Sequence, residues 1–204
     1  NISRTTSPNN EYIRNERPQQ PQMQLAVEAS FEATERVEFN GIINYLRNRL
    51  FDNIDITASS ILNRGFSPYN VAHFDDPGSN FQSKDARGSW ICFDFKDRRV
   101  IPTNYEIKSR NCSEGASHLR NWVIEGSNTG GESESEWTIL DRKDNDGSLL
   151  GLRKSCIYDI QLPQGSEEGY RYLRMRQIGP DSSGSYYLTL PALEYFGVLI
   201  KMNK

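Results

Sequence analysis

Two short apolar segments separated by four charged residues lie between residues 89 and 108, and they restrict the fold more than any other stretch. From Ile91 to Phe95 every second residue is large and apolar, the spacing of side chains that share one face of a β-strand. The same alternation returns from Tyr105 to Ile107. Residues 96–99, Lys-Asp-Arg-Arg, are too polar to bury and indicate a turn. The segment therefore predicts two β-strands joined by a solvated turn.

The first of these strands also carries Trp90, Cys92 and Asp94 at its intervening positions. Apolar residues on both faces are typical of a strand in the middle of a sandwich, where both faces are covered. Because an unpaired buried carboxylate is costly, we expect Asp94 to accept hydrogen bonds.

Strand-like segments recur along the rest of the chain, separated by turns rich in Gly, Pro, Asn and Asp. Short strands with such punctuation indicate an all-β sandwich or barrel with a core between the inward faces. Further strands are expected over residues 54–60, 119–127, 137–140, 156–162, 170–177 and 188–196, and the core over Ile91, Phe93, Tyr105, Ile107, Trp122, Ile124, Leu173, Met175 and Leu193.

The N-terminal part has a different composition. Residues 1–22 are rich in Asn, Gln, Pro, Arg and Ser, which predicts a disordered linker. Between residues 23 and 39 some apolar residues recur at helical spacing and others fall off that face, so the segment is either a short helix or more linker. Residues 39–46 predict a better-defined short helix with one apolar face, which Leu50 extends. The predicted organisation is a mostly disordered linker, residues 1–36, followed by one β-sandwich domain, residues 37–200.

Charge, hydropathy and cysteine content indicate which ligands and which cellular compartments suit this chain. A net charge of −3 argues against binding nucleic acid or an acidic membrane through bulk electrostatics. No apolar run approaches the roughly 18 residues that cross a bilayer, so no transmembrane segment is expected. The three cysteines include no CxxC pair, and their odd number favours free thiols in a reducing compartment. The chain does not begin with Met, which suggests a piece of a longer protein.

Five segments occur in an order that matches a known family: SWICFDF from residue 89, VIPTNYEIKSR from 100, LRNWVIEGSN from 119, RYLRMRQIGP from 171 and YLTLPALEYFG from 187. Together they resemble the discoidin domain, also called the coagulation factor V/VIII type C domain. The resemblance covers residues 39–199. It implies a jelly-roll β-sandwich of the galactose-binding-like fold.

The chain also departs from the extracellular members of that family. It has no cysteine before Cys92 or near Gly197, so the disulfide that usually links the first and last strands is absent, and its acidic insert, residues 129–136, is longer than the usual hairpin turn. WVIEGSN and FNGIINYL are similar to the intracellular branch, in which the domain follows a BTB adaptor domain or sits in a large ubiquitin ligase. The resemblance therefore implies a non-catalytic, cytoplasmic module for protein recognition in an adaptor or ubiquitin-ligase component. The extracellular relatives imply the alternative, binding of a carbohydrate or a phospholipid headgroup.

Candidate contact residues lie in loops that a sandwich gathers at one end, residues 65–78, 110–118 and 179–187. Aromatic rings beside planar hydrogen-bonding groups suit a sugar, and arginine and tyrosine often dominate protein interfaces. No cofactor is expected. The candidate binding residues are Phe74, Arg110, His118, Tyr186 and Tyr187.

Other chemistry has weaker support. Ser117 and His118 supply parts of a catalytic triad, but no G-x-S-x-G elbow accompanies them, so no enzyme is expected. Cys112 and His118 lack zinc-ligand spacing to another cysteine. Asp75 and Asp76, beside Gly78, form either a plain turn or a calcium site. The arginines of the strand from residue 170 either bind an anion or pair with acidic residues opposite them.

Overall fold

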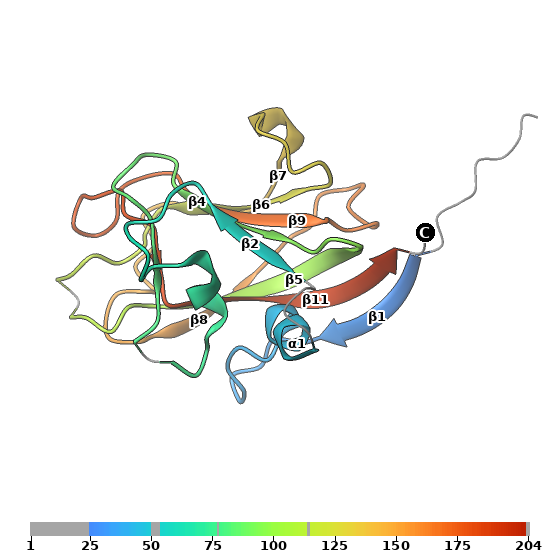
Figure 1. Cartoon of the computed structure of the whole chain (residues 1–204), viewed down its shortest axis with the longest axis horizontal. Coiled ribbons are helices and arrows are strands. Elements are labelled where there is room, and N and C mark those ends of the chain that lie inside the picture. Colours follow the sequence, from blue (N-terminus) through green and yellow to red (C-terminus); the bar gives the residue numbers. More distant parts are fainter. Residues whose placement is uncertain (1–24, 50–53, 77, 114, 203–204) are drawn as a thin grey trace, which may run out of the picture.

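The computed structural model describes residues 25–49, 54–76, 78–113 and 115–202, which form a sandwich of two antiparallel sheets (Figure 1). The four-stranded sheet has the order β1 (Leu25–Phe31), β11 (Ala192–Met202), β5 (Arg98–Lys108) and β8 (Ser155–Asp159). The five-stranded sheet has the order β2 (Asp55–Ala58), β4 (Trp90–Asp94), β9 (Tyr172–Gln177), β6 (Trp122–Ser127) and β7 (Thr138–Lys143). The remaining elements are the pair β3 (Phe81–Gln82) and β10 (Thr189–Leu190), the helix α1 (Ile42–Arg49) and the 3-10 turns η2 (Pro68–Ala72) and η3 (Glu134–Glu136).

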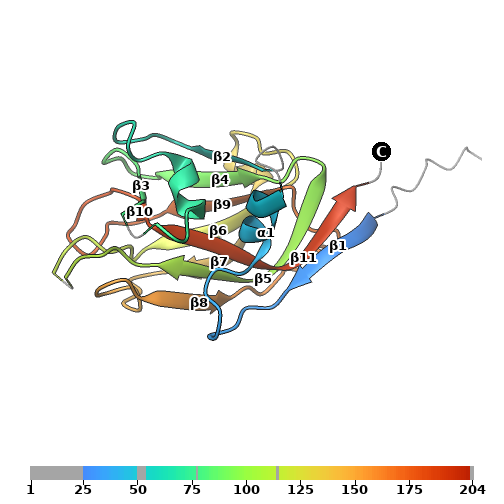
Figure 2. The same ribbon diagram turned by 60° about the horizontal axis from the view of Figure 1, so that its bottom comes forward.

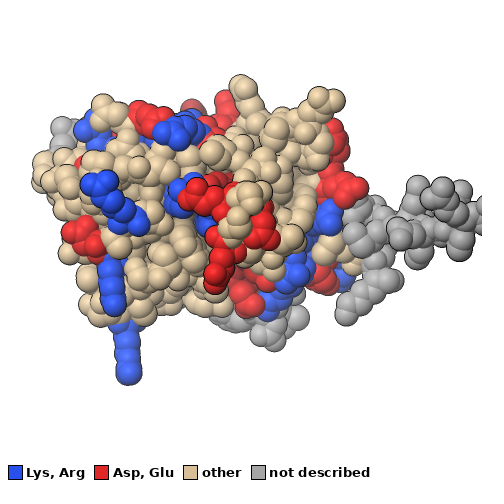
Figure 3. Space-filling model, turned by 90° about the horizontal axis from the view of Figure 1, so that it is seen from above, with Lys and Arg blue, Asp and Glu red and all other residues tan. Residues whose placement is uncertain are grey.

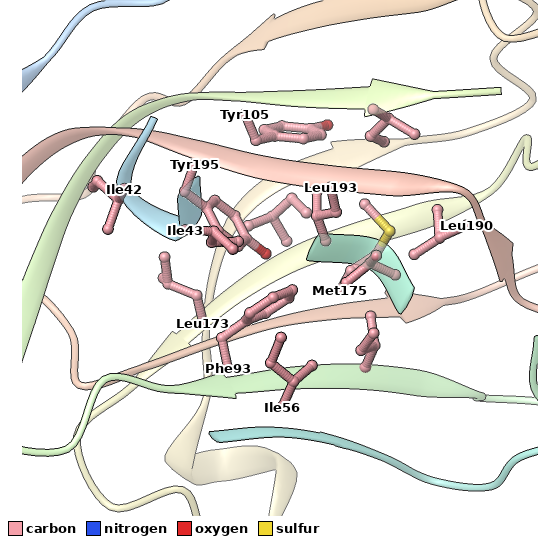
Figure 4. Packing of buried hydrophobic residues seen from close by; sticks show 14 of the residues in the cluster. Ile42, Ile43, Ile56, Phe93, Tyr105, Leu173, Met175, Leu190, Leu193 and Tyr195 are labelled. Atoms are coloured by element: carbon pink, nitrogen blue, oxygen red, sulfur yellow. The ribbon is translucent and has the colours of Figure 1, made fainter. Parts of the chain in front are cut away.

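This architecture confirms the predicted all-β sandwich with one short helix. None of the nine residues predicted for the core is more than 1% exposed. Phe93, Leu173 and Met175 of the five-stranded sheet face Leu193 and Tyr195 of the other sheet (Figure 4). The alternation in the sequence identified these faces correctly because side chains on a strand change face at every residue.

The expected turn joins two strands, β4 and β5, which lie in different sheets, so the chain crosses between layers there. Two local predictions were wrong, and the first concerns the segment from residue 96 to 99, which was expected to be solvated throughout. Within it Arg98 is buried, because its guanidinium pairs with Glu28 Oε2 of β1 at 2.7 Å. Gly197 does not close the last strand. It lies at a bulge with a φ of 128°, where a Cβ would be 2.1 Å from the Ile101 carbonyl oxygen, and β11 continues beyond it.

The helix considered for residues 23–39 is also absent: β1 occupies Leu25–Phe31 and pairs with β11 from Met202 to Gly197. Pairing provides hydrogen-bond partners for the backbone N–H and C=O groups at the edge of β11. This stabilisation outweighs the weak helical preference that the partial helical spacing indicates. The sheet therefore includes part of the predicted linker, while residues 1–22 lie outside the described residues. Where the folding unit begins stays a prediction.

Figures 1 and 2 show the start of β1 beside the end of β11 at one end of the sandwich. The end of β5 at Lys108 and the start of β11 at Ala192 are paired at the opposite end, which is formed by loops.

Helix α1 packs against β11 through an acceptor on the strand. Both carboxylate oxygens of Glu194 accept N–H groups, from Gly41 at 3.3 Å, Ile43 at 2.7 Å and Asn44 at 2.9 Å, and from Tyr195 at 2.8 Å. Burial raises the pKa of Glu194 to about 8, against these four N–H groups, which favour the ionised form. The side chain thus supplies the acceptors that the first turn of a helix lacks.

Replacing Glu194 by alanine is expected to lower the free energy of unfolding by about 2–3 kcal/mol, because buried N–H groups would lose their acceptor whichever form the carboxyl takes. Chemical denaturation measures the change. Glu38→Ala is the control, since its half-exposed ion pair with Lys108 contributes only about 0–1 kcal/mol. Equal losses in the two variants would contradict the assigned role.

Candidate functional site

A pocket of about 250 Å³ opens at the loop end of the sandwich, where β5 ends and β11 begins. We call it the loop pocket. Residues 73, 74, 76 and 78–80 form one wall, and residues 108–112 with Arg153 form the other. Its side chains include one aromatic ring and several planar hydrogen-bonding groups. The most relevant are Phe74, Asn80, Lys108, Arg110, Asn111 and Arg153.

The loop pocket holds more positive than negative charge. Lys108 Nζ lies 2.8 Å from Glu38 Oε2 and is neutralised by it. The side chains of Arg110 and Arg153 form no ion pair or hydrogen bond with any other described residue, although their backbones are joined by a hydrogen bond of 3.0 Å from Arg153 N to Arg110 O. Two guanidinium groups are therefore free to contact a ligand.

Two further groups complete the chemistry of the loop pocket. Asn80 Oδ1 is buried and accepts no hydrogen bond from a described residue. Such an orphaned acceptor is unusual, because buried polar atoms are normally paired. The ring of Phe74 stacks on that of Phe39 at a centroid distance of 5.1 Å, which fixes its orientation at the wall. The pocket can thus offer donors, one acceptor and an apolar face.

The structure brings only part of the predicted contact set together. Phe74 and Arg110 line the loop pocket. His118 is 2% exposed, and its Nε2 lies 2.8 Å from Ser113 O and 3.7 Å from Cys112 Sγ. Its backbone N–H donates to Ser182 Oγ at 2.8 Å, so His118 fastens loop 110–118 to loop 179–187.

The two tyrosines lie outside this pocket. Tyr186 donates its N–H to Asp85 Oδ1 at 2.7 Å, and the guanidinium of Arg87 lies over its ring at 4.7 Å. Tyr187 is half-buried. Their role in ligand contact remains a prediction.

The weaker catalytic and metal hypotheses find no matching geometry in the part of the chain that the structure describes. Ser117 Oγ contacts Ser183 Oγ at 2.9 Å, and its hydroxyl makes no contact with His118. Asp76 Oδ1 accepts the N–H of Gly78 at 2.9 Å, as in a plain turn. No group of three or more His, Cys, Asp or Glu residues is placed to hold a metal ion among these residues.

Other sequence predictions about charge and thiols can be checked directly. The arginines of β9 pair with acidic residues, Arg174 and Arg176 with Glu125, so the pairing interpretation is confirmed. Cys92, Cys112 and Cys156 are free. None of the described helices is long and apolar enough to span a lipid bilayer.

Sequence reasoning missed Asn80 and Arg153. Arg153 lies in the loop between β7 and β8 and has a φ of 47°, while Asn80 precedes β3. The two residues lie in loops far apart in the sequence, and both line the loop pocket because these loops meet at one end of the sandwich. No spacing along the chain signals this.

Comparison with known proteins places the fold. No family model matches the chain. It is 31% identical over 127 residues to the E3 ubiquitin-protein ligase Ufd4 of Drosophila melanogaster, a match that covers 62% of this chain and 4% of that protein. The chain thus spans only a small part of the length of this curated relative.

Solved structures give a broader match. Chitosan-binding module 1 of a chitosanase/glucanase from Paenibacillus sp. IK-5 is 16% identical, has a TM-score of 0.51 and covers 71% of this chain and 96% of its own. The CBM32 of AlyQ, in complex with 4,5-unsaturated mannuronic acid, is 17% identical with a TM-score of 0.50 and covers 70% and 93%. CBM62 of Clostridium thermocellum Xyl5A is 25% identical with a TM-score of 0.51 and covers 72% and 94%.

These likenesses establish the fold. The chain has the galactose-binding-like, discoidin-like β-sandwich fold of these carbohydrate-binding modules.

Proposed function

We propose that this chain is a non-catalytic recognition module that binds a saccharide in the loop pocket. The observation that carries the proposal is the meeting in one pocket of two guanidiniums, Arg110 and Arg153, with the acceptor Asn80 Oδ1, none of which has a side-chain partner among the described residues. A sugar hydroxyl both donates and accepts hydrogen bonds, so it can satisfy both kinds of group at once.

The charge of the pocket suggests which saccharides fit best. Guanidinium groups bind carboxylates and other oxyanions through paired, charge-assisted hydrogen bonds. A sugar with a carboxylate or sulfate group would therefore bind more tightly than its neutral counterpart. The solved neighbours named for chitosan and for an unsaturated mannuronic acid support saccharide binding by this fold.

Arg110→Ala and Arg153→Ala are each expected to weaken binding of an acidic saccharide by about ten- to a hundredfold, because each removes a charge-assisted contact worth roughly 1.5–3 kcal/mol. Since neither side chain forms an ion pair or hydrogen bond with another described residue, the melting temperature should stay nearly unchanged. A glycan array with neutral, uronate and sulfated sugars identifies the probe, and calorimetry measures the affinities.

Glu134→Gln on the acidic hairpin is the control and should bind normally. Tyr186→Ala tests whether a longer ligand reaches beyond the pocket, which would appear as a loss only for longer saccharides. If the array finds no ligand, or if both arginine variants bind as tightly as the unmodified chain, saccharide binding in this pocket is wrong.

A second candidate function is protein recognition within an intracellular adaptor or ubiquitin-ligase component. The likeness to part of Ufd4 favours it, and three free thiols suit a reducing, cytoplasmic compartment. Affinity capture from cell extract, compared between the unmodified chain and Arg110→Ala, distinguishes the two. A protein captured by the first and lost by the second, with no array ligand, would favour this candidate.

A further inference from the structure

A second hollow, of about 540 Å³, lies on the outer face of the five-stranded sheet and is not used by the proposed function. We call it the sheet trough. Its floor consists of outward side chains from three neighbouring strands, which the register places in rows. One row joins Asp55, Asp94 and Tyr172, and the next joins Thr57, Cys92 and Arg174.

One side of the trough is raised by the hairpin between β6 and β7, residues 128–137. Figure 1 shows this hairpin standing above the sheet. Its base is rigid, because Trp137 Nε1 donates to Gly131 O at 2.9 Å and a Cβ on Gly130 would lie 2.8 Å from the Tyr172 ring. The trough is therefore a preformed concave surface.

Aromatic and neutral groups dominate the floor. Trp90, Trp137 and Tyr172 line the trough together, and the guanidinium of Arg171 already lies over the Tyr172 ring at 4.8 Å. Cys92 lies among them, and burial raises the pKa of its thiol to about 12, so it stays protonated. Arg174 stacks on Trp137 at 3.9 Å and is neutralised by Glu125, whose Oε2 accepts its Nε–H at 2.8 Å. The floor thus presents aromatic rings with little net charge.

The free charge around the trough is negative. Asp94 is paired with Arg171: desolvation opposes ionisation, but that bond and the N–H of Lys96 lower the pKa of the carboxyl. Asp55 is paired with Lys96 at 3.1 Å. Glu132, which lines the trough, is exposed and forms no ion pair or hydrogen bond with another described residue.

More acidic groups stand beside Glu132. Glu134 and Glu136 are also exposed on the hairpin, and only Glu134 forms an ion pair, with Arg176 at 3.3 Å. Figure 3 views this face and shows acidic side chains gathered near its middle. Rings that attract cations and an unpaired carboxylate thus lie on one concave surface.

We infer that the sheet trough binds a basic peptide segment, with one arginine or lysine side chain seated against Trp90, over whose ring no cation of another described residue lies, and its charge facing Glu132. Aromatic faces attract such cations through their quadrupole, and the hairpin glutamates attract basic residues that flank the seated one. The loop pocket has the opposite charge, so the two sites select different ligands.

The probes are a short, N-acetylated and C-amidated Gly/Ser peptide with two central arginines, its lysine analogue and its citrulline analogue, which keeps the shape and loses the charge. Intrinsic fluorescence reports on the trough, because Trp90 and Trp137 line it whereas Trp122 is fully buried. Calorimetry gives the affinities. We expect the arginine or lysine peptide to bind about tenfold more tightly than the citrulline peptide.

Two variants locate the site. Glu132→Gln should weaken binding severalfold, whereas Glu167→Gln, the same change on an exposed loop elsewhere, should leave it unchanged. Thr57→Arg should abolish binding, because Thr57 is exposed on the trough floor and a cation there blocks the site without disturbing the core.

Three results would overturn the inference: no binding of either cationic peptide, equal binding of the citrulline peptide, or loss of peptide binding in Arg110→Ala. The last would place the peptide in the loop pocket. Saccharide binding is measured on the same variants, so a failure here and a failure of the proposed function are separately visible.

Discussion

Replacing Phe93 by alanine is expected to lower the free energy of unfolding by about 3–5 kcal/mol. Phe93 is fully buried, and its ring meets that of Tyr195 from the opposite sheet edge-to-face, with centroids 5.5 Å apart. Ile56 and Leu173 flank it in register on the neighbouring strands. Because both sheets are fixed by their hydrogen bonds, the space left by the ring cannot close, and the cost of a cavity adds to the lost burial.

Urea denaturation followed by circular dichroism measures this change. Ile139→Ala is the matched control, since Ile139 is also an apolar strand residue but is 50% exposed, and it should cost less than about 1 kcal/mol. A loss below ~1 kcal/mol for Phe93→Ala would mean that the ring does not anchor the two sheets.

The sequence predicts the features of this fold that depend on neighbouring residues, and it does not predict those that depend on contacts between distant segments. Alternation from Ile91 to Phe95 reports directly on which face is buried, because it follows from strand geometry alone. The turn after it has the same composition whether the next strand pairs with β4 or crosses to the other sheet. Only the partners decide this: β4 pairs with β2 and β9, and β5 pairs with β11 and β8.

The segment Leu25–Phe31 shows the same limit for local structure. Its apolar residues fit a helix and a strand about equally well. The edge of β11, more than 160 residues later in the chain, selects the strand by pairing with it. A local pattern cannot contain that information, since tertiary context overrides weak propensity.

The candidate site was predicted in part for a similar reason. Phe74 and Arg110 stand out because binding residues concentrate in loops, and aromatic and arginine side chains often contribute most to binding. His118 also lies in a loop, but it is buried and its hydrogen bonds join two loops to each other. Asn80 and Arg153 carry no signal in the sequence, because what distinguishes them is that Asn80 Oδ1 and the Arg153 guanidinium have no partner among the described residues of the folded chain.

Glu125→Gln is the second change with a large expected effect, about 3–5 kcal/mol lost from the free energy of unfolding. Glu125 of β6 is 2% exposed and pairs with two arginines of β9: Arg174 Nε lies 2.8 Å from its Oε2, and Arg176 Nη2 lies 2.6 Å from its Oε1. Glutamine keeps the shape but removes the charge, and its amide N–H₂ would face guanidinium donors. The largely buried charge of Arg174 would then have no counter-ion.

Glu168→Gln makes the same chemical change in an exposed pair with Arg99, where the carboxylate side chain is 72% exposed, and should cost only about 0–1 kcal/mol. Urea denaturation in low and high salt compares them. Salt screens exposed pairs far more than buried ones, so the Glu125 effect should persist at high salt while the Glu168 effect disappears. Equal small effects would show that Arg174 is held by Trp137 alone. A large effect would show that the Glu125 carboxylate stabilises the sheet. Because the same carboxylate holds Arg174, which lines the sheet trough, Glu125→Gln should also weaken peptide binding there.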